Sequence, residues 1–191
     1  MAGPRVTGTV STPNPHTLSV RLTTPVAKVC RYNSGFFWRS ELLKDYDWYW
    51  RVEPSTGFYC DQLYDPFTFM RINNKRYSFV MSLFEFRSTI ETLWASTREF
   101  AQLHPDYLAA DNAIEFLTDS KDKDAMFSKD FNLCHFWSNF EIADLNLWRS
   151  KPYRDYFDFL DRKGGFFYER WGDAPVHTIA AAMVGWLLPL A

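Results

Sequence analysis

The sequence feature that most constrains the fold is an alternation of strand-like and helix-like stretches. Residues 48–53 (WYWRVE) alternate aromatic and polar side chains, as a half-buried strand does, and Pro54 and Gly57 then force a turn. Arg76 to Leu83 has the character of a second strand, and a helical pattern follows it from Ser88 to Leu103. Strands that alternate with helices in this way predict an α/β fold.

Helix start and stop signals refine this prediction. Ser88 is expected to cap its helix, with Glu91 at the capping-box position. Pro66 directly after an aspartate is typical of a first helical turn. Gly164 and Gly165 are expected to end the last amphipathic helix. The predicted helical segments are Ser34 to Tyr46, Asp65 to Met70, Ser88 to Leu103 and Pro152 to Arg162.

The two ends of the chain differ from the patterned region between them. Residues 1–29 carry four of the ten prolines, which predicts a flexible or weakly extended segment. Residues 30–182 form the predicted domain, and residues 183–191 an apolar tail. No signal peptide or membrane anchor is visible. Thr178 to Ala191 is too short and too Pro-interrupted for a membrane span, so a buried helix is expected there.

Composition excludes some classes of function. The net charge of −2 gives no basic field that would hold nucleic acid, so nucleic acid is not an expected partner. Cys30, Cys60 and Cys134 lack metal-ligand spacing. Their odd number permits one disulfide and a free thiol, or a partner cysteine in missing sequence. The aromatic fraction of 19% suits either an aromatic-rich core or the stacking of a sugar or a nucleobase.

Acidic residues near a strand end are candidates to hold a divalent cation beside a diphosphate. Two Asp-x-Asp pairs occur, but Asp45 and Asp47 precede their strand, and Asp122 and Asp124 lie in a charge-rich loop. Glu53 is better placed, because it ends the aromatic strand, where α/β folds bring ligands to the sheet edge. The alternative is a surface glutamate.

A second candidate region is NLCHFWSNFE, which runs from Asn132 to Glu141. It places His135, Asn139 and Glu141 among large aromatic residues, where polar groups must be hydrogen-bonded or used by a ligand. Glu141 could act as a nucleophile, as a base, or as a stabiliser of an oxocarbenium-like state. The alternative is a glutamate that is bonded to nearby backbone.

The third region, YERWGDAPVH, runs from Tyr168 to His177. Arg170 could neutralise a phosphate or a carboxylate, and His177 lies four residues after Asp173, so the two can share a helix face. The alternative for Asp173 is a simple helix cap. A glycosidase in which Glu53 and Glu141 flank a sugar also stays open.

Long strings in these regions resemble the fungal α-1,2-mannosyltransferases of glycosyltransferase family 15, the Golgi enzymes that extend O- and N-linked mannans. The resemblance covers residues 30–182, and the matching strings follow one another in the family's order. They are CRYNSGFFWRSELL (from Cys30), YWRVEP (from Tyr49), YDPFTFM (from Tyr64), NLCHFWSNFEIADLNLWRS (from Asn132) and YRDYFDFLDRKGGFFYERWGDAPVHTIAA (from Tyr153).

The resemblance implies a partial GT-A-like α/β domain that uses GDP-mannose and Mn²⁺, passes mannose to a mannoside acceptor and retains the anomeric configuration. It implies that Glu53 is the acid near the metal and the diphosphate. It further implies that Glu141 is the nucleophile and Asp173 an active-site acid, with His177 as a neighbour of the site. Arg170 is a candidate for cofactor binding on its charge alone.

The chain also departs from the family pattern. Ser55 stands where the motif often carries a second acid. Residues 1–29 match no family segment, and the end in MVGWLLPLA replaces a segment that carries a metal-binding histidine. We therefore expect a fragment, from a gene-model error or a splice variant, without transferase activity. Family members are type II Golgi membrane proteins. The alternative function is a binding or scaffolding fragment that associates with related full-length mannosyltransferases.

Overall fold

A four-stranded sheet lies beside the centre of the molecule. The computed structural model describes residues 24–119, 129–184 and 187–189. The strand order is β1 (Trp48–Val52), β5 (Phe140–Asp144), β2 (Tyr77–Phe79) and β6 (Leu187–Pro189). β5 pairs antiparallel with both β1 and β2, and β6 pairs parallel with β2. The strand predicted from Trp48 to Glu53 is therefore confirmed, ending one residue earlier.

A separate two-stranded sheet pairs β3 (Ser82–Phe84) with β4 (Cys134–Phe136). The prediction of one strand from Arg76 to Leu83 is wrong in this respect, because the chain forms two strands there. The first strand, β2, is buried against β5, whereas the second, β3, is exposed and pairs with β4. The chain changes partner between them, at residues 80 and 81.

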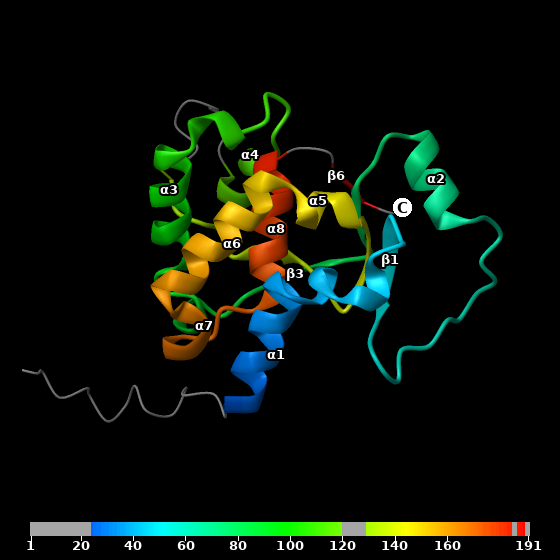
Figure 1. Cartoon of the computed structure of the whole chain (residues 1–191), viewed down its shortest axis with the longest axis horizontal. Coiled ribbons are helices and arrows are strands. Elements are labelled where there is room, and N and C mark those ends of the chain that lie inside the picture. Colours follow the sequence, from blue (N-terminus) through cyan, green and yellow to red (C-terminus); the bar gives the residue numbers. More distant parts are fainter. Residues whose placement is uncertain (1–23, 120–128, 185–186, 190–191) are drawn as a thin grey trace, which may run out of the picture.

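Helices cover the sheets, and the mixed α/β class is confirmed (Figure 1). α2, which is reached through the long loop after β1, lies at the opposite end of the molecule from α3, α6 and α7. The helices are α1 (Thr24–Gly35), α2 (Pro66–Ile72), α3 (Leu93–Leu103), α4 (Ile114–Thr118), α5 (Leu145–Arg149), α6 (Lys151–Lys163), α7 (Gly165–Tyr168) and α8 (Asp173–Val184). Short 3₁₀ turns are Phe37–Arg39, Glu41–Leu43, Arg87–Thr89 and Pro105–Tyr107.

α8 is the central helix of the core. It is buried from Pro175 to Met183, which explains why its sequence is apolar without an amphipathic period. It packs against α1, α4, α6 and β4. The Thr178 hydroxyl accepts a hydrogen bond of 2.8 Å from the Phe136 backbone N–H, so α8 is also tied to the edge of the small sheet. The buried helix expected from Thr178 to Ala191 is confirmed as far as Val184, but it is wrong for Leu187–Pro189, which pair with β2 as strand β6.

α6 forms as its sequence predicts. The Ser150 hydroxyl accepts from the Tyr153 N–H at the first turn, with a proline at the start of the helix. Gly164 ends the helix in a left-handed conformation (φ 79°). The buried face consists of Tyr153, Tyr156, Phe157 and Leu160. The predicted cap of α2 is also confirmed, because Asp65 accepts from the Phe67 N–H at 3.0 Å.

Helix starts were predicted less well. α3 begins at Leu93 rather than at Ser88, because the acceptor at its start is Glu169, which bonds the Thr92 N–H and hydroxyl at 3.1 and 2.5 Å. α1 begins at Thr24, so the expected flexible or extended character of residues 24–29 is wrong. Pro25 occupies its first turn, where a missing N–H costs little.

Two other expectations meet mixed outcomes. The helix predicted from Ser34 to Tyr46 is wrong, because α1 ends at Gly35 and two 3₁₀ turns follow it. Cys30, Cys60 and Cys134 are all free thiols.

Most of the charge-rich loop that contains Asp122 and Asp124 lies outside the described residues. Within the described ranges, no helix combines the length and hydropathy that a bilayer crossing needs.

Candidate active site

Three neighbouring strands direct polar side chains to the face of the main sheet that α8 covers. In the β1–β5 pair, Arg51 lies opposite Glu141 and Tyr49 lies opposite Ala143. Residues opposite each other in an antiparallel pair project to the same face of the sheet. Tyr77 on β2 flanks β5 on its other side. The alternation of side chains along these strands therefore gathers two tyrosines, an arginine and a glutamate at one place.

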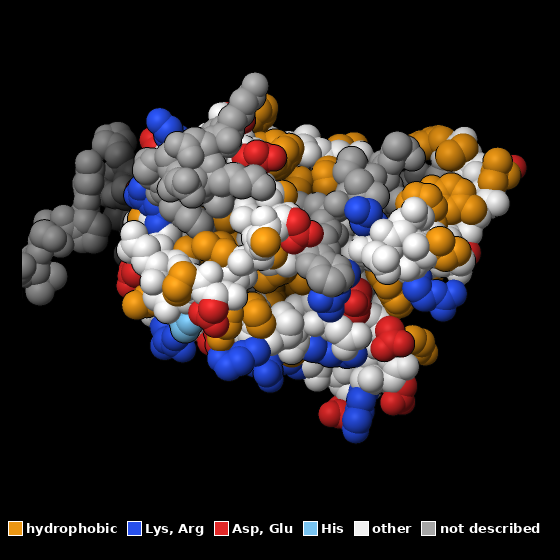
Figure 2. Space-filling model, turned by 90° about the horizontal axis from the view of Figure 1, so that it is seen from above, with side chains coloured by type: hydrophobic (Ala, Val, Ile, Leu, Met, Phe, Trp, Pro, Cys, Tyr) orange, Lys and Arg blue, Asp and Glu red, His pale blue; other side chains and the backbone are white. Residues whose placement is uncertain are grey.

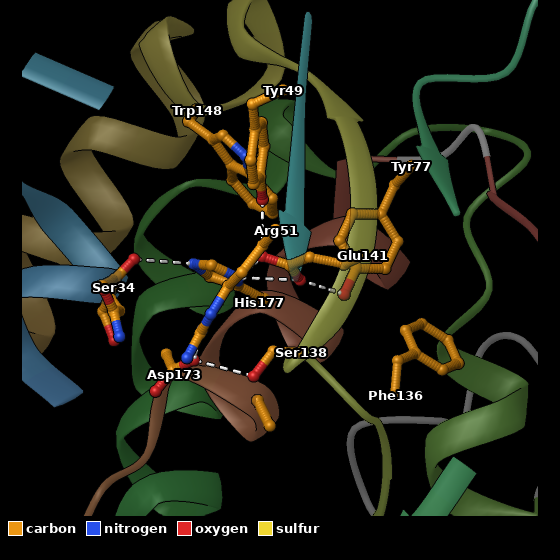
Figure 3. A network of polar contacts seen from close by, with 12 residues as sticks. Ser34, Tyr49, Arg51, Tyr77, Phe136, Ser138, Glu141, Trp148, Asp173 and His177 are labelled. Carbon is orange, nitrogen blue, oxygen red and sulfur yellow. Dashed lines mark hydrogen bonds and ion pairs between the residues drawn. The ribbon is translucent and has the colours of Figure 1, made fainter. Parts of the chain in front are cut away.

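Glu141 is the buried centre of this cluster, with 1% of its surface exposed. Its Oε1 accepts from the Tyr49 hydroxyl at 2.5 Å, and its Oε2 accepts from the Tyr77 hydroxyl at 2.7 Å. His177 Nδ1 lies 3.2 Å from Oε1 and 3.3 Å from Oε2 (Figure 3). A buried carboxylate is costly unless donors replace its water shell, and here two tyrosine hydroxyls donate to it, with His177 Nδ1 within hydrogen-bond distance.

The two tyrosines remain donors at neutral pH. Burial, and next the charge of Glu141, raise the pKa of Tyr49 and of Tyr77 well above the ordinary value. Tyr49 is also fixed from behind, since its hydroxyl accepts from Trp148 Nε1 at 3.1 Å. Trp148 in turn stacks on the His177 ring, with centroids 4.3 Å apart. The carboxylate is therefore held in one orientation by a continuous set of contacts.

A second acid, Asp173, lies beside this cluster at the first residue of α8. Its Oδ2 accepts a short charged hydrogen bond from Arg51 and a 2.7 Å bond from the Ser138 hydroxyl. Arg51 also bonds Glu53 Oε1 through Nε at 3.0 Å and Nη2 at 2.5 Å. Although burial opposes it, the charge of Asp173 and the hydrogen bond to Glu53 raise the Arg51 pKa above its usual range. Arg51 thus joins two acids that are far apart in sequence.

The structure brings together most, but not all, of the residues singled out in the sequence. Glu141, Asp173 and His177 lie in one network, and Glu53 reaches it through Arg51. Arg170 lies apart from this network: its guanidinium is 4.0 Å from Glu85, in the 3₁₀-linked segment before α3. The dense run from residue 168 to residue 177 therefore divides between two environments.

Several members of the network were not among the predicted site residues. They are Tyr49, Arg51, Tyr77, Ser138 and Trp148. The period of two along β1 was the available signal, because it places Tyr49, Arg51 and Glu53 on one face. Tyr77, Ser138 and Trp148 carry no such signal, since each meets its partner in the network (Glu141, Asp173 and Tyr49, respectively) only when distant segments fold together.

The described residues do not by themselves form a metal centre. Among them, no group of three or more His, Cys, Asp or Glu side chains is placed to hold an ion. Glu53 is one isolated carboxylate whose Oε1 is bonded to Arg51. Asp45 and Asp47 precede β1, as expected, and Asp122 and Asp124 lie outside the described residues. This part of the chain therefore does not fit a complete Mn²⁺ site.

A cavity of about 290 Å³ opens beside Glu141. This volume is near the lower end of small-molecule sites, and such sites combine apolar walls with a few fixed polar groups. The lining residues are Asn33, Phe37, Leu43, Tyr49, Trp50, Arg51, Glu141 and His177. Aromatic rings next to an orientated carboxylate and a guanidinium suit a polar ligand that also has an apolar face, as a sugar has.

The fold is that of the GT-A-like mannosyltransferases. The crystal structure of core-mannan synthase A from Aspergillus fumigatus, in its Mn/GDP form, matches with a TM-score of 0.76 and 45% identity, over 83% of this chain and 43% of that one. The mannosyltransferase Ktr4p of Saccharomyces cerevisiae in complex with GDP matches with a TM-score of 0.78 and 45% identity, over 84% of this chain and 41% of that one.

The chain belongs to the glycolipid 2-alpha-mannosyltransferase family, whose model matches residues 16–186. Glycolipid 2-alpha-mannosyltransferase 2 of Candida albicans is 59% identical over 155 residues, which are 81% of this chain and 32% of that protein. The Saccharomyces cerevisiae glycolipid 2-alpha-mannosyltransferase is 58% identical over 155 residues, or 81% of this chain and 34% of that protein. The predicted family is confirmed, and the chain spans about a third of these relatives.

Proposed function

We propose that this chain contributes the acidic residues Glu141, Asp173 and Glu53 to the active centre of a retaining α-1,2-mannosyltransferase. The reaction would pass mannose from GDP-mannose to a mannoside hydroxyl, in the Golgi lumen as family membership suggests. The observation that carries the proposal is the buried, triply hydrogen-bonded Glu141 at the wall of an aromatic cavity, within a chain of this family. The domain boundary at residues 30–182 remains part of this proposal.

In this reaction Glu141 would face the anomeric carbon of the donor sugar. A carboxylate there can attack that carbon as the bond to GDP breaks, and the acceptor hydroxyl then displaces the carboxylate, so that two inversions give retention. Alternatively it can stabilise an oxocarbenium-like transition state, and retention then follows if the acceptor attacks from the face that GDP leaves. Donors from Tyr49, Tyr77 and His177 hold both carboxylate oxygens. Such preorganisation avoids reorientation of the group during the reaction.

The second acid and its partners would serve the departing diphosphate. Asp173, bonded to Arg51 and Ser138, would keep the guanidinium orientated toward the cavity that Arg51 lines. Glu53, directly after β1, would lie near the metal and the diphosphate. The contact between Arg170 and Glu85 is long, at 4.0 Å, and Arg170 would supply a further positive charge on the donor side.

For the chain on its own, we expect no transfer, because its described residues do not complete a Mn²⁺ site. The test is incubation with GDP-mannose, Mn²⁺ and methyl α-mannoside, with the Glu141→Gln variant as the control. Product formation by the unaltered chain should not exceed that of the variant. Turnover clearly above the variant would contradict this expectation.

The transfer reaction itself can be tested in a chimera. The matching 155-residue segment of the Saccharomyces cerevisiae relative would be replaced by that of this chain, which is 58% identical. The chimera is expected to form an α-1,2-linked dimannoside from GDP-mannose, with the linkage and the anomeric configuration read by NMR. Two results would argue against the proposal: a soluble, folded chimera that binds GDP but forms no product, or a product with a β-linkage.

A second candidate function is that of a binding or scaffolding fragment, and the exposed apolar surface favours it. Figure 2 shows hydrophobic side chains gathered at the end of the molecule that carries α2. Strongly exposed apolar residues of α2, its preceding loop and the β3 region are Tyr59 (98%), Leu63 (90%), Ile72 (72%), Phe84 (77%) and Phe86 (70%). Surfaces of this kind are typical of protein interfaces.

Calorimetry separates the two candidates. A donor-binding fragment should bind GDP more tightly with Mn²⁺ than without it. A scaffold should show no metal-dependent GDP binding and should co-purify with a related full-length mannosyltransferase.

A further inference from the structure

The hydrogen-bond partners of His177 determine which of its ring nitrogens carry protons. His177 is buried with 1% of its surface exposed, and its Nε2 lies 3.1 Å from the backbone carbonyl oxygen of Asn33. A carbonyl oxygen can only accept, so Nε2 must carry a proton. Nδ1, on the other side of the ring, faces the carboxylate of Glu141 at 3.2–3.3 Å. A neutral ring with its proton on Nε2 would point a lone pair at that carboxylate.

The remaining partners of Glu141 show where the proton of this contact belongs. The Tyr49 hydroxyl accepts from Trp148 Nε1 at 3.1 Å, so its own proton is directed to Glu141 Oε1. The Tyr77 hydroxyl lies 2.7 Å from Oε2 and, being fully buried, keeps its proton. Both oxygens of Glu141 therefore already accept from phenols, as an ionised carboxylate does.

We infer that His177 is an imidazolium, doubly protonated, and that it forms a buried ion pair with an ionised Glu141. Nε2–H donates to Asn33 and Nδ1–H donates to Glu141, so every polar atom of the ring has a matching partner. The positive ring lies over Trp148 with an interplanar angle of 24°, an arrangement that favours a cation. A charge on one partner alone would be costly at this depth.

The other titratable groups around the pair are consistent with one positive ring. The groups that face it are Tyr49 and Arg51 from β1, Tyr77 from β2, Tyr153 from α6 and Asp173 from α8. From α1 the ring meets the backbone carbonyl oxygen of Asn33, which does not titrate. Arg51 and Asp173 compensate each other, and the tyrosines stay neutral because burial raises the pKa of Tyr49, Tyr77 and Tyr153.

His177 is thus a positioning residue, and this role rests on the proposed function. An imidazolium fixed between the Asn33 carbonyl of α1 and Glu141 of β5 keeps Glu141 charged and orientated. Because burial excludes water, the two charges are already in place before the reaction begins, and no free energy is spent on orienting them during it. The protonation state itself can be measured without any transfer reaction, so it is open to test even if the proposed function fails.

The test is nitrogen NMR on the full chain labelled with ¹⁵N-histidine at pH 7. The chain has four histidines. The pair of ring-nitrogen signals that disappears in the His177→Gln variant is thereby assigned to His177. In the unaltered chain both ring nitrogens of His177 should give signals of protonated nitrogens. In Glu141→Gln, Nδ1 should move to the position of an unprotonated nitrogen. Glu85→Gln is the matched control and should leave the His177 signals unchanged.

Two results would overturn the inference. One is an unprotonated Nδ1 in the unaltered chain, which would place the proton on Glu141 or remove it from the pair. The other is a His177 that stays doubly protonated in a folded Glu141→Gln variant, because the ion pair would then not be its cause. If that variant does not fold, the spectrum of the unaltered chain alone decides the question.

Discussion

Replacement of Arg51 by Met tests whether the ion pair between β1 and α8 supports the fold. The Arg51 side chain is 19% exposed and that of Asp173 is 12% exposed. Removal of the guanidinium therefore leaves a largely buried acid that keeps the hydrogen bond from Ser138. Loss of one member of a fully buried pair costs about 3–5 kcal/mol. Because this pair is partly hydrated, we expect a loss of about 2–3 kcal/mol. Glu53, whose side chain is 38% exposed, is rehydrated and adds little.

The assay is urea unfolding followed by tryptophan fluorescence, in a double-mutant cycle with Asp173→Asn. The double variant should be less destabilised than the sum of the single variants, with a coupling of about 1–3 kcal/mol. Thermal midpoints should fall by roughly 2–4 °C for each kcal/mol in a chain of this size. Arg39→Met is the matched control: its pair with Asp158 is 3.4 Å long and about half exposed, so its pair term should be about 1 kcal/mol or less.

Two outcomes would refute this reasoning. One is a coupling below about 0.5 kcal/mol, the scatter expected for independent sites, which would mean that the guanidinium and the carboxylate do not depend on each other. The other is an Arg51→Met variant as stable as Arg39→Met, because burial of the first pair would then have no energetic consequence.

Further predictions concern the buried network, a tight packing contact and a thiol. Tyr49→Phe removes a donor to Glu141 and should cost about 1–3 kcal/mol in urea unfolding; an unchanged midpoint would count against the bond. Gly165→Ala would place a Cβ 2.0 Å from the Trp171 ring and should cost about 1–3 kcal/mol, and a neutral substitution would contradict this packing. Burial raises the pKa of Cys30 to about 11, so at pH 8 its alkylation should be about 100-fold slower in the folded chain than in urea. Equal rates, measured by mass spectrometry, would show that the thiol is not buried.

The sequence predicted best where a signal is local. The cap at Ser150, the proline at the start of α6 and the glycine at its end act within one turn, so α6 forms nearly as expected. The start of α3 was mispredicted because its acceptor, Glu169, lies far away in the chain. The two-strand nature of residues 77–84 likewise depends on two different partner strands, which a local pattern cannot indicate.

The candidate site was predicted through its acids and missed in most of their partners. Family strings pointed to Glu141 and Asp173, which lie in one network. Tyr49, Arg51 and Tyr77, on β1 and β2, donate to these acids from 64 to 122 residues away along the chain. Ser138 donates to Asp173 from 35 residues away, and Trp148 on α5 supports Tyr49 rather than an acid. A single sequence contains no sign of such pairings. Arg170 failed to join the network because its guanidinium turns toward Glu85.

The most direct test of the central claim is the rate of mannose transfer by the chimera with and without the Glu141 carboxylate. Glu141→Gln keeps the shape of the side chain and removes its charge, and it should lower kcat by at least about 100-fold with little change in GDP affinity. Glu115→Gln, at an exposed position of α4, is the matched control and should leave kcat unchanged. A Glu141→Gln chimera that transfers mannose at the control rate would contradict the account.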